Sequence, residues 1–165
     1  MKSLTQRQQF MGLAGWLMLA YIAAAIGAVA SVNAAEFYQQ LQQPSWAPPA
    51  GAFGPVWTTL YTLMGIAAWL VWREKPTQNV RPALTLFVVQ LALNALWSWL
   101  YFVWQLGAIA FAGTVVLWIL ILATLIAFWR IKPLAGALLV PYLAWVTLAT
   151  ALTWSTWHLN PQVLG

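Results

Sequence analysis

Residues 108–129 read AIAFAGTVVLWILILATLIAFW, a run without a single charged side chain. A helix rises 1.5 Å per residue, so about 20 such residues cross a hydrocarbon core of about 30 Å. Four further apolar runs of similar length occupy residues 12–32, 53–72, 83–104 and 134–157. Short connections join them. The sequence therefore predicts an all-α membrane protein, a bundle of five transmembrane helices that forms one integral membrane domain over residues 1–165.

The composition narrows the functional classes. The chain is 63% hydrophobic and 5% charged, whereas soluble domains are about 45–50% apolar and about 25% charged. Its two acidic residues, Glu36 and Glu74, fall in predicted loops, so no carboxylate pair is expected inside the membrane for acid–base catalysis or proton-coupled transport. The absence of cysteine excludes disulfides, thiolate catalysis and cysteine-ligated metals.

The basic residues all fall on one side of the predicted bundle. They precede the first helix or join helices two to three and four to five: Lys2, Arg7, Arg73, Lys75, Arg81, Arg130 and Lys132. By the positive-inside rule the N-terminus is cytoplasmic and the C-terminus lies outside. These charges flank helices and form no nucleic-acid-binding patch. With no recognisable transit peptide, the pattern favours a multi-pass protein of a bacterial cell membrane.

The N-terminal run imitates a signal peptide, with Ala28-Val29-Ala30 resembling a cleavage site. The run is longer than the 7–15 apolar residues usual for signal peptides. We expect it to be retained as the first helix. Small residues at four-residue spacing, including Ala20, Ala24 and Ala28, predict close approach of a neighbouring helix.

Polar and aromatic residues form a stripe on each of three helices at helical spacing. The stripes are Phe53, Trp57, Tyr61 and Met64 on the second helix; Gln90, Asn94, Trp97, Tyr101 and Trp104 on the third; and Tyr142, Trp145, Ala149 and Thr153 on the fifth. An unpaired amide in lipid costs several kcal/mol, so Gln90 and Asn94 should face protein, a ligand or water. A hydrogen bond between helices would satisfy them. Their coincidence with aromatic stripes favours a small-molecule pocket.

Residues 33–52 form a loop rich in rigid and aromatic residues, with PSWAPP at 44–49. Prolines 44, 48, 49 and 55 disfavour helix at the preceding residues, so we expect a stiff, non-helical segment. With Phe37, Tyr38, Trp46 and Phe53 it has enough apolar surface to fold over the bundle. We expect a lid over the outer mouth of the pocket; the alternative is a loop resting on lipid headgroups.

These motifs resemble the TspO or translocator protein family, also called tryptophan-rich sensory proteins or peripheral-type benzodiazepine receptors. The resemblance covers nearly the whole chain. It rests on Phe37-Tyr38, PSWAPP, FGPVWTTLYTLMG at 53–65, QLALNALWSWLYF at 90–102 and VPYLAWVTLATALTW at 140–154. It implies a five-helix bundle, commonly a homodimer, that binds protoporphyrin IX and haem and, in some members, cholesterol or synthetic aromatic drugs.

By position, the resemblance and the stripes together give the expected ligand-binding residues: Tyr38, Trp46, Phe53, Trp57, Tyr61, Asn94, Trp97, Tyr142, Trp145 and Ala149. The cholesterol motif of animal members needs a tyrosine and a basic residue near the C-terminus. This chain has none beyond residue 157, so among lipids the bilayer itself is the expected partner, with a sterol-like lipid a weaker one.

Three functions remain open. The first is a membrane receptor or carrier for tetrapyrroles, with a sensory or transport role. The second, which the resemblance implies, is light- and oxygen-dependent porphyrin degradation with Trp57 and Trp145 as redox partners. The third is a structural protein whose stripes only pack the bundle. No metal or cofactor is expected to be required, and His158 is expected to be an interfacial residue rather than an axial haem ligand.

Overall fold

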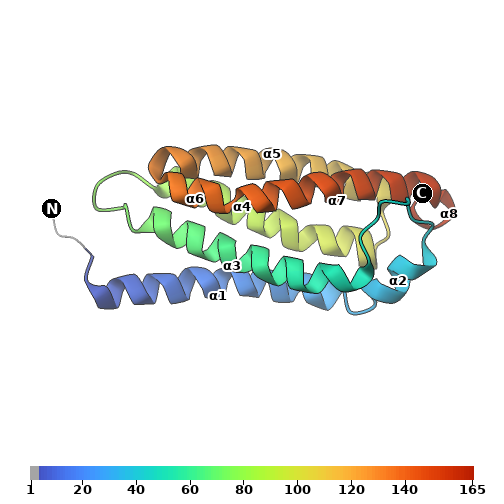
Figure 1. Cartoon of the computed structure of the whole chain (residues 1–165), viewed down its shortest axis with the longest axis horizontal. Helices are drawn as coiled ribbons and strands as arrows, with labels where there is room; N and C mark the ends of the chain where they lie inside the picture. Colours follow the sequence, from blue (N-terminus) through green and yellow to red (C-terminus); the bar gives the residue numbers. More distant parts are fainter. Residues whose placement is uncertain (1–3) are drawn as a thin grey trace.

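The computed structural model describes residues 4–165, which form helices and contain no strand. Lys2, one of the basic residues counted above, lies outside this range. Five helical stretches are long and apolar enough to cross a membrane: Gln6–Ala30, Ala50–Trp72, Arg81–Val103, Gly107–Ile131 and Pro133–Leu159. The expected all-α bundle of five transmembrane helices is confirmed (Figure 1).

Helix α1 (Gln6–Ala30) begins six residues before the apolar run does. The Thr5 hydroxyl accepts from the Gln8 amide N–H at 3.2 Å, and the Gln8 Oε1 accepts from the Thr5 N–H at 3.0 Å. This capping box satisfies two backbone donors that the first turn would otherwise leave unpaired. An apolar run identifies only the part of a helix that lies in lipid. The capped polar turn extends α1 beyond that part, which is why the helix begins before the run.

The connection between α1 and α3 (Phe53–Trp72) is partly helical, which corrects the expectation of a non-helical segment. Residues Ala34–Gln40 form helix α2, and Ala50–Ala52 form the 3₁₀ turn η1. The α2 stretch contains neither proline nor glycine and buries Phe37 against the ring of Tyr101, with centroids 6.0 Å apart. Between the two helical pieces, the segment with prolines 44, 48 and 49 is irregular as expected.

Helix α4 (Arg81–Ser98) continues into a π-helical turn, η2 (Trp99–Val103). The Trp104 amide N–H bonds the Trp99 carbonyl five residues back at 2.9 Å. A π turn shifts the faces of all later residues. Trp104 therefore leaves the stripe on which regular spacing placed it and is 52% exposed, while Tyr101 stays buried. Gln105 then takes a left-handed conformation, with φ 53°, and ends the helix.

The last transmembrane stretch is broken in two, as α6 (Pro133–Leu138) and α7 (Val140–Leu159). Pro141 has no amide N–H to continue the hydrogen-bond ladder, and the Leu139 N–H instead bonds the Gly136 carbonyl three residues back. A last short helix, α8 (Pro161–Leu164), buries Leu164 at the same end of the bundle as α2.

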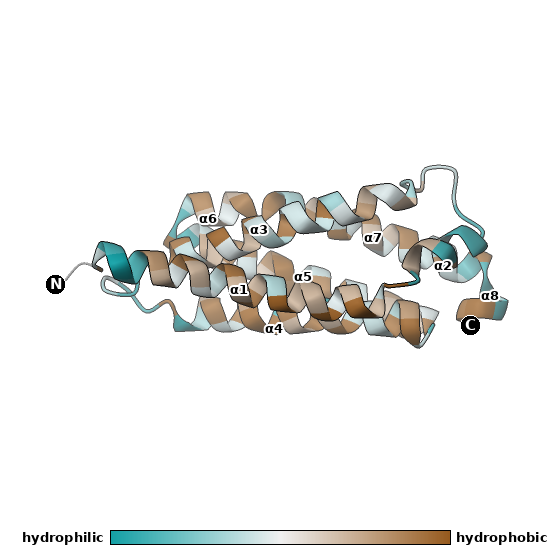
Figure 2. Ribbon diagram, turned by 90° about the horizontal axis from the view of Figure 1, so that it is seen from below, coloured by the Kyte–Doolittle hydropathy of each residue, from teal (hydrophilic) through white to brown (hydrophobic). Residues whose placement is uncertain are grey.

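The long helices run side by side with the two chain ends at opposite ends of the bundle (Figure 1). Helix α1 packs on α3 and α4, and α5 (Gly107–Ile131) packs on α4, α6 and α7. Hydrophilic residues gather at the start of α1 and in α2, at opposite ends (Figure 2). The direction of the bundle across the membrane stays a prediction, as do the single domain and the homodimer.

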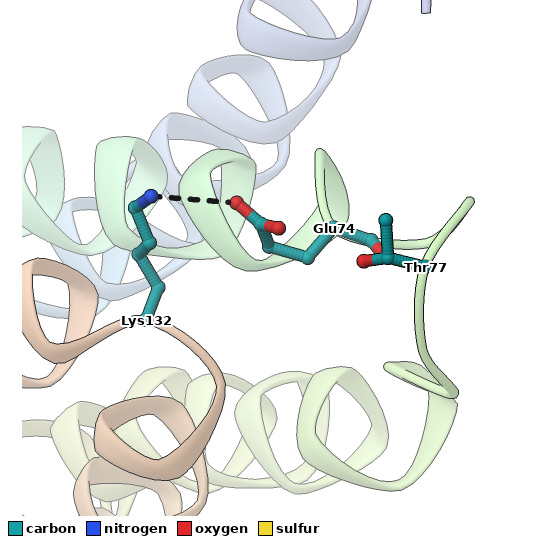
Figure 3. A network of polar contacts seen from close by, with 3 residues as sticks. All are labelled: Glu74, Thr77 and Lys132. Atoms are coloured by element: carbon teal, nitrogen blue, oxygen red, sulfur yellow. Dashed lines mark hydrogen bonds and ion pairs between the residues drawn. The ribbon is translucent and has the colours of Figure 1, made fainter. Parts of the chain in front are cut away.

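At the end that holds most basic residues, an ion pair joins two connections. The Lys132 Nζ lies 3.6 Å from Glu74 Oε1, and the Thr77 hydroxyl donates to the Glu74 carbonyl at 2.7 Å (Figure 3). Both charged side chains are partly exposed, so this pair contributes at most about 1 kcal/mol.

Close packing holds α1 against α3 in this half of the bundle. A Cβ added at Gly65 would lie 3.0 Å from the backbone Cα of Leu17, so only glycine fits this approach. The Trp69 indole N–H donates to the Gln9 carbonyl at 2.9 Å. Phe87 and Phe128 stack in the core nearby, with ring centroids 5.8 Å apart.

Candidate ligand-binding site

A cavity of about 430 Å³ lies within the bundle, in the half that carries α2. Four long helices, α2, η1, η2 and the connection between α1 and α2 supply its lining. The lining residues are Tyr21, Ala24, Gly27, Ala28, Ser31, Ala34, Ala35, Tyr38, Ala50, Phe53, Gly54, Trp57, Thr58, Tyr61, Asn94, Trp97, Ser98, Tyr101, Phe102, Trp145, Ala149, Leu152 and Thr153. The volume lies within the range of small-molecule pockets, about 300–1,000 Å³.

Aromatic rings bridge α3 and α7 across one side of the cavity. Phe53 meets Trp145 edge to face with centroids 5.7 Å apart, and Trp57 meets Tyr142 in the same way at 6.3 Å. Tyr61 lies one turn below Trp57, with centroids 5.7 Å apart. The two edge-to-face pairs have the spacings and angles preferred by aromatic rings, whereas Trp57 and Tyr61 are tilted by 36°. The rings hold one another in place and leave their remaining faces to the cavity.

A chain of buried hydrogen bonds crosses from α4 to α7 at the floor of the cavity. The Asn94 Nδ2 donates to the Tyr142 hydroxyl at 2.7 Å, and that hydroxyl donates to Gln90 Oε1, also at 2.7 Å. All three side chains are at most 3% exposed. Gln90 therefore makes a hydrogen bond between helices and does not line the cavity. Of the two roles expected for it, the structure shows the bond between helices.

Asn94 belongs both to this chain and to the cavity wall. Its Nδ2 is taken by Tyr142, and its Oδ1 accepts no hydrogen bond from residues 4–165. On the opposite wall, the Trp145 Nε1 is buried and has no partner among the same residues. A buried donor without an acceptor is costly. The cavity thus offers the Asn94 Oδ1 to a bound molecule as one acceptor, whereas the Trp145 Nε1 has no accessible surface on the cavity.

The segment between α1 and α3 covers the end of the cavity. The Tyr38 hydroxyl donates to the Pro48 carbonyl at 2.9 Å, and the Tyr38 ring meets Phe53 at 5.3 Å. Burial raises the pKa of Tyr38, so its hydroxyl stays protonated and remains a donor. The Gln43 Nε2 donates to the Tyr38 carbonyl. Whether this segment closes on a ligand stays a prediction.

A second set of bonds ties the same segment to the end of α7. The Asn160 Oδ1 accepts from the Gln42 N–H at 2.8 Å, and the Asn160 Nδ2 donates to the Gln42 carbonyl at 3.0 Å and to the Thr156 carbonyl at 2.8 Å. The Thr156 hydroxyl in turn bonds the Tyr101 hydroxyl at 2.7 Å. Asn160 therefore acts as a clamp between the covering segment and the helices beneath it.

The structure brings most of the expected site residues together. Tyr38, Phe53, Trp57, Tyr61, Asn94, Trp97, Trp145 and Ala149 line the cavity. Tyr142 does not; it lies behind the wall, in contact with Trp57 and Asn94. Trp46 does not either: it is 47% exposed on the outer surface of the covering segment. That the lining residues bind a ligand stays a prediction.

The α1 side of the cavity was not foreseen. Tyr21, Ala24, Gly27, Ala28 and Ser31 supply it. The small residues of this run predict a packing surface, which they also provide, since a Cβ added at Gly27 would lie 3.2 Å from the Ser98 hydroxyl oxygen. The one tyrosine of this apolar run, Tyr21, is the feature of the sequence that could have indicated this side of the cavity.

His158 lies outside the cavity, exposed at the end of α7. Its ring packs against Trp154 at 4.2 Å and Trp157 at 4.5 Å, and its Nδ1 lies 2.9 Å from the Trp154 carbonyl oxygen. Among residues 4–165 there is no group of three or more histidine and acidic side chains that could hold a metal ion.

Comparison with known proteins gives a consistent picture. Residues 14–158 match the model of the TspO/MBR family. The chain is 40% identical to Protein CrtK of Rhodobacter capsulatus, over 84% of this chain and 86% of the relative. It is 38% identical to the tryptophan-rich sensory protein of Cereibacter sphaeroides (88% and 92%) and 40% identical to the human translocator protein (75% and 75%). None of these three names is that of an enzyme.

Proposed function

This chain belongs to the TspO/MBR family, and from that premise we propose that it is a membrane receptor or carrier that binds a tetrapyrrole, such as protoporphyrin IX or haem, in the cavity between α3, α4 and α7. The observation that carries the proposal is the wall of four aromatic rings, Phe53, Trp57, Tyr61 and Trp145, facing the buried Asn94. A flat macrocycle offers large faces to such rings, and its stacking needs no charge.

The polar groups suit a ligand that is mostly apolar with few hydrogen-bonding atoms. Asn94 Oδ1 can accept from a pyrrole N–H, and the ring of Trp145 can stack on the macrocycle. Within the part of the chain that the structure describes, the lining has no charged side chain. The propionates of a porphyrin would therefore remain hydrated near the covering segment.

A photochemical role for the same site is the second candidate. It is favoured by one observation: Trp57 and Trp145, the residues expected to act as redox partners, both line the cavity. Illuminated porphyrin would then be oxidised by oxygen while held against these rings. The names of the relatives, which are sensory and translocator names, give this activity no support.

The test is a titration of the purified protein with protoporphyrin IX in the dark, followed by tryptophan fluorescence, beside Asn94→Ala and Trp145→Phe. We expect saturable quenching in the parent protein and an affinity about 5–20-fold lower in each variant, or about 1–1.8 kcal/mol. The loss comes from one buried hydrogen bond in Asn94→Ala and from ring contact in Trp145→Phe. Equal, unsaturable quenching in all three proteins would mean that the rings only pack the bundle.

Illumination of the same samples, and of a variant in which Trp57 and Trp145 are both replaced by Phe, separates the two candidates. If the protein is a carrier, the porphyrin stays intact in the parent protein. Any loss of porphyrin absorbance on illumination is then the same in the parent protein and in Trp145→Phe. A degrading enzyme converts several equivalents of porphyrin per protein and stops when Trp57 and Trp145 are both replaced by Phe.

A further inference from the structure

Helices α1 and α3 are in close contact in one half of the bundle and separate in the other. Their backbones touch at Gly65 and Leu17. One turn beyond, the contact is made only by side chains, the Tyr21 hydroxyl reaching the Thr62 hydroxyl at 2.6 Å. Further along, Gly27 packs on Ser98 of α4 instead. Figure 2 shows the two helices diverging toward the end that carries α2.

The cavity is exposed where the two helices diverge. Five lining residues are exposed: Tyr21, Ala28, Ala35, Gly54 and Thr58. All five belong to α1, α2 or α3. Every lining residue on the α4 and α7 side is buried or half-buried. The cavity therefore opens on one side only, between α1 and α3.

This opening extends from the end of the bundle, near Ala28 and Gly54, to the depth of the lipid chains at Tyr21. Tyr21 is about 14 Å from the end of α1 at 1.5 Å per residue, roughly half-way through a hydrocarbon core of about 30 Å. Thr58 lies in the second turn of α3. The residues between are small, and a Cβ added at Gly54 would have nothing within 4 Å. Apart from Tyr21, the exposed lining residues all have small side chains: Ala28, Ala35, Gly54 and Thr58.

In contrast to the side between α1 and α3, the end of the cavity that faces water is covered by a segment held by hydrogen bonds. The bonds from Tyr38 to Pro48 and from Asn160 to Gln42, together with the contact of Tyr38 with Phe53, hold the covering segment in place. A ligand entering from water must break several of these at once, whereas one entering from the bilayer passes only small side chains.

We infer that the gap between α1 and α3 is a lateral portal, through which the cavity takes up its ligand directly from the lipid phase. The inference rests on the proposed function and deepens it: the ligand class is then flat molecules that partition into membranes. Tyr21 and Thr62, joined by their hydroxyls, form the inner edge of the portal.

Two matched pairs of variants test the portal. Thr58→Phe narrows it, whereas Thr59→Phe places the same ring on the neighbouring residue, which is also exposed and bonds the carbonyl four residues back, but does not line the cavity. Gly54→Leu narrows it from the first turn of α3. Gly15→Leu is its control, since Gly15 is also exposed, helical and surrounded by open space.

The measurement is stopped-flow quenching of the protein in phosphatidylcholine vesicles mixed with vesicles that carry protoporphyrin IX. We expect Thr58→Phe and Gly54→Leu to slow both association and dissociation by at least about fivefold, because a narrowed passage raises one barrier for both directions. The two controls should bind at the parent rate.

Two outcomes would overturn the portal while leaving the site intact. One is saturable binding whose rates are equal in each matched pair. The other is loss of association when the covering segment is fastened by a cross-link between Gln42→Cys and Asn160→Cys, which would be the only cysteines in the chain. Absence of saturable binding in the parent protein would instead refute the proposed function and the portal with it.

Discussion

Replacing Tyr142 by Phe removes one oxygen atom and with it both hydrogen bonds that join α4 to α7 below the cavity. The hydroxyl accepts from Asn94 and donates to Gln90, each at 2.7 Å, and is fully buried. Side-chain hydrogen bonds in membrane proteins contribute about 0.6 kcal/mol on average and at most about 1.7. Two of them give about 1.2 kcal/mol, with an upper bound of about 3.4.

The structure indicates that Tyr142→Phe costs more stability than two average side-chain hydrogen bonds. Gln90 Oε1 keeps no other donor among residues 4–165, and the Gln90 Nε2 reaches only the Met64 sulfur at 3.9 Å. We therefore expect Tyr142→Phe to lower the free energy of unfolding by about 1.5–3 kcal/mol, because a buried acceptor is left unpaired. Asn94 can partly recover by turning toward the cavity.

Tyr61→Phe is the matched control. Tyr61 is also buried and also belongs to the aromatic wall, but its hydroxyl makes no hydrogen bond with residues 4–165. Its loss should cost less than about 0.5 kcal/mol. Reversible unfolding by sodium dodecyl sulfate in mixed micelles, followed by circular dichroism, compares the two. Equal stability of the two variants would refute the assignment of the Asn94–Tyr142–Gln90 chain as a structural link.

Two further predictions concern the frame around the cavity. Gly65→Ala should lower the free energy of unfolding by about 1–3 kcal/mol in the same assay, because the added methyl meets Leu17 backbone atoms at 3.0 Å, whereas Gly54→Ala should be neutral or stabilising by up to about 1 kcal/mol. Asn160→Ala removes both bonds to Gln42, so amide hydrogen exchange in residues 41–49 should rise at least 10-fold while exchange in α5 is unchanged; equal exchange would exclude a clamp.

The helices and the stripes follow from simple periodicities, which is why they were predictable. Residues 53–72 form α3 with the expected bounds, since a proline- and glycine-rich segment precedes it and Arg73 follows. Phe53, Trp57 and Tyr61 share a face at helical spacing and do line one wall. The helical period of 3.6 residues is enough to predict which residues share one face of a helix, because that spacing does not depend on contacts with other helices.

What could not be predicted depends on contacts between distant residues or on local departures from regular helix. The π turn that moves Trp104 outward has no signal in hydropathy. Tyr142 lies on the expected face of α7, but its hydroxyl is hydrogen-bonded to Asn94 and Gln90. Its ring therefore packs behind the cavity wall. Trp46 lies on the covering segment between α1 and α3, and composition alone does not say which side of that segment a ring takes.

The central claim is that the cavity itself binds the ligand, and filling it is the most direct test. Ala149 lines the cavity from α7, whereas Ala144 is exposed on the same helix and does not. The dissociation constant of protoporphyrin IX should be measured in the dark for Ala149→Phe and Ala144→Phe. We predict a loss of affinity of at least 10-fold for Ala149→Phe and none for Ala144→Phe; parent-like binding by both variants would contradict the account.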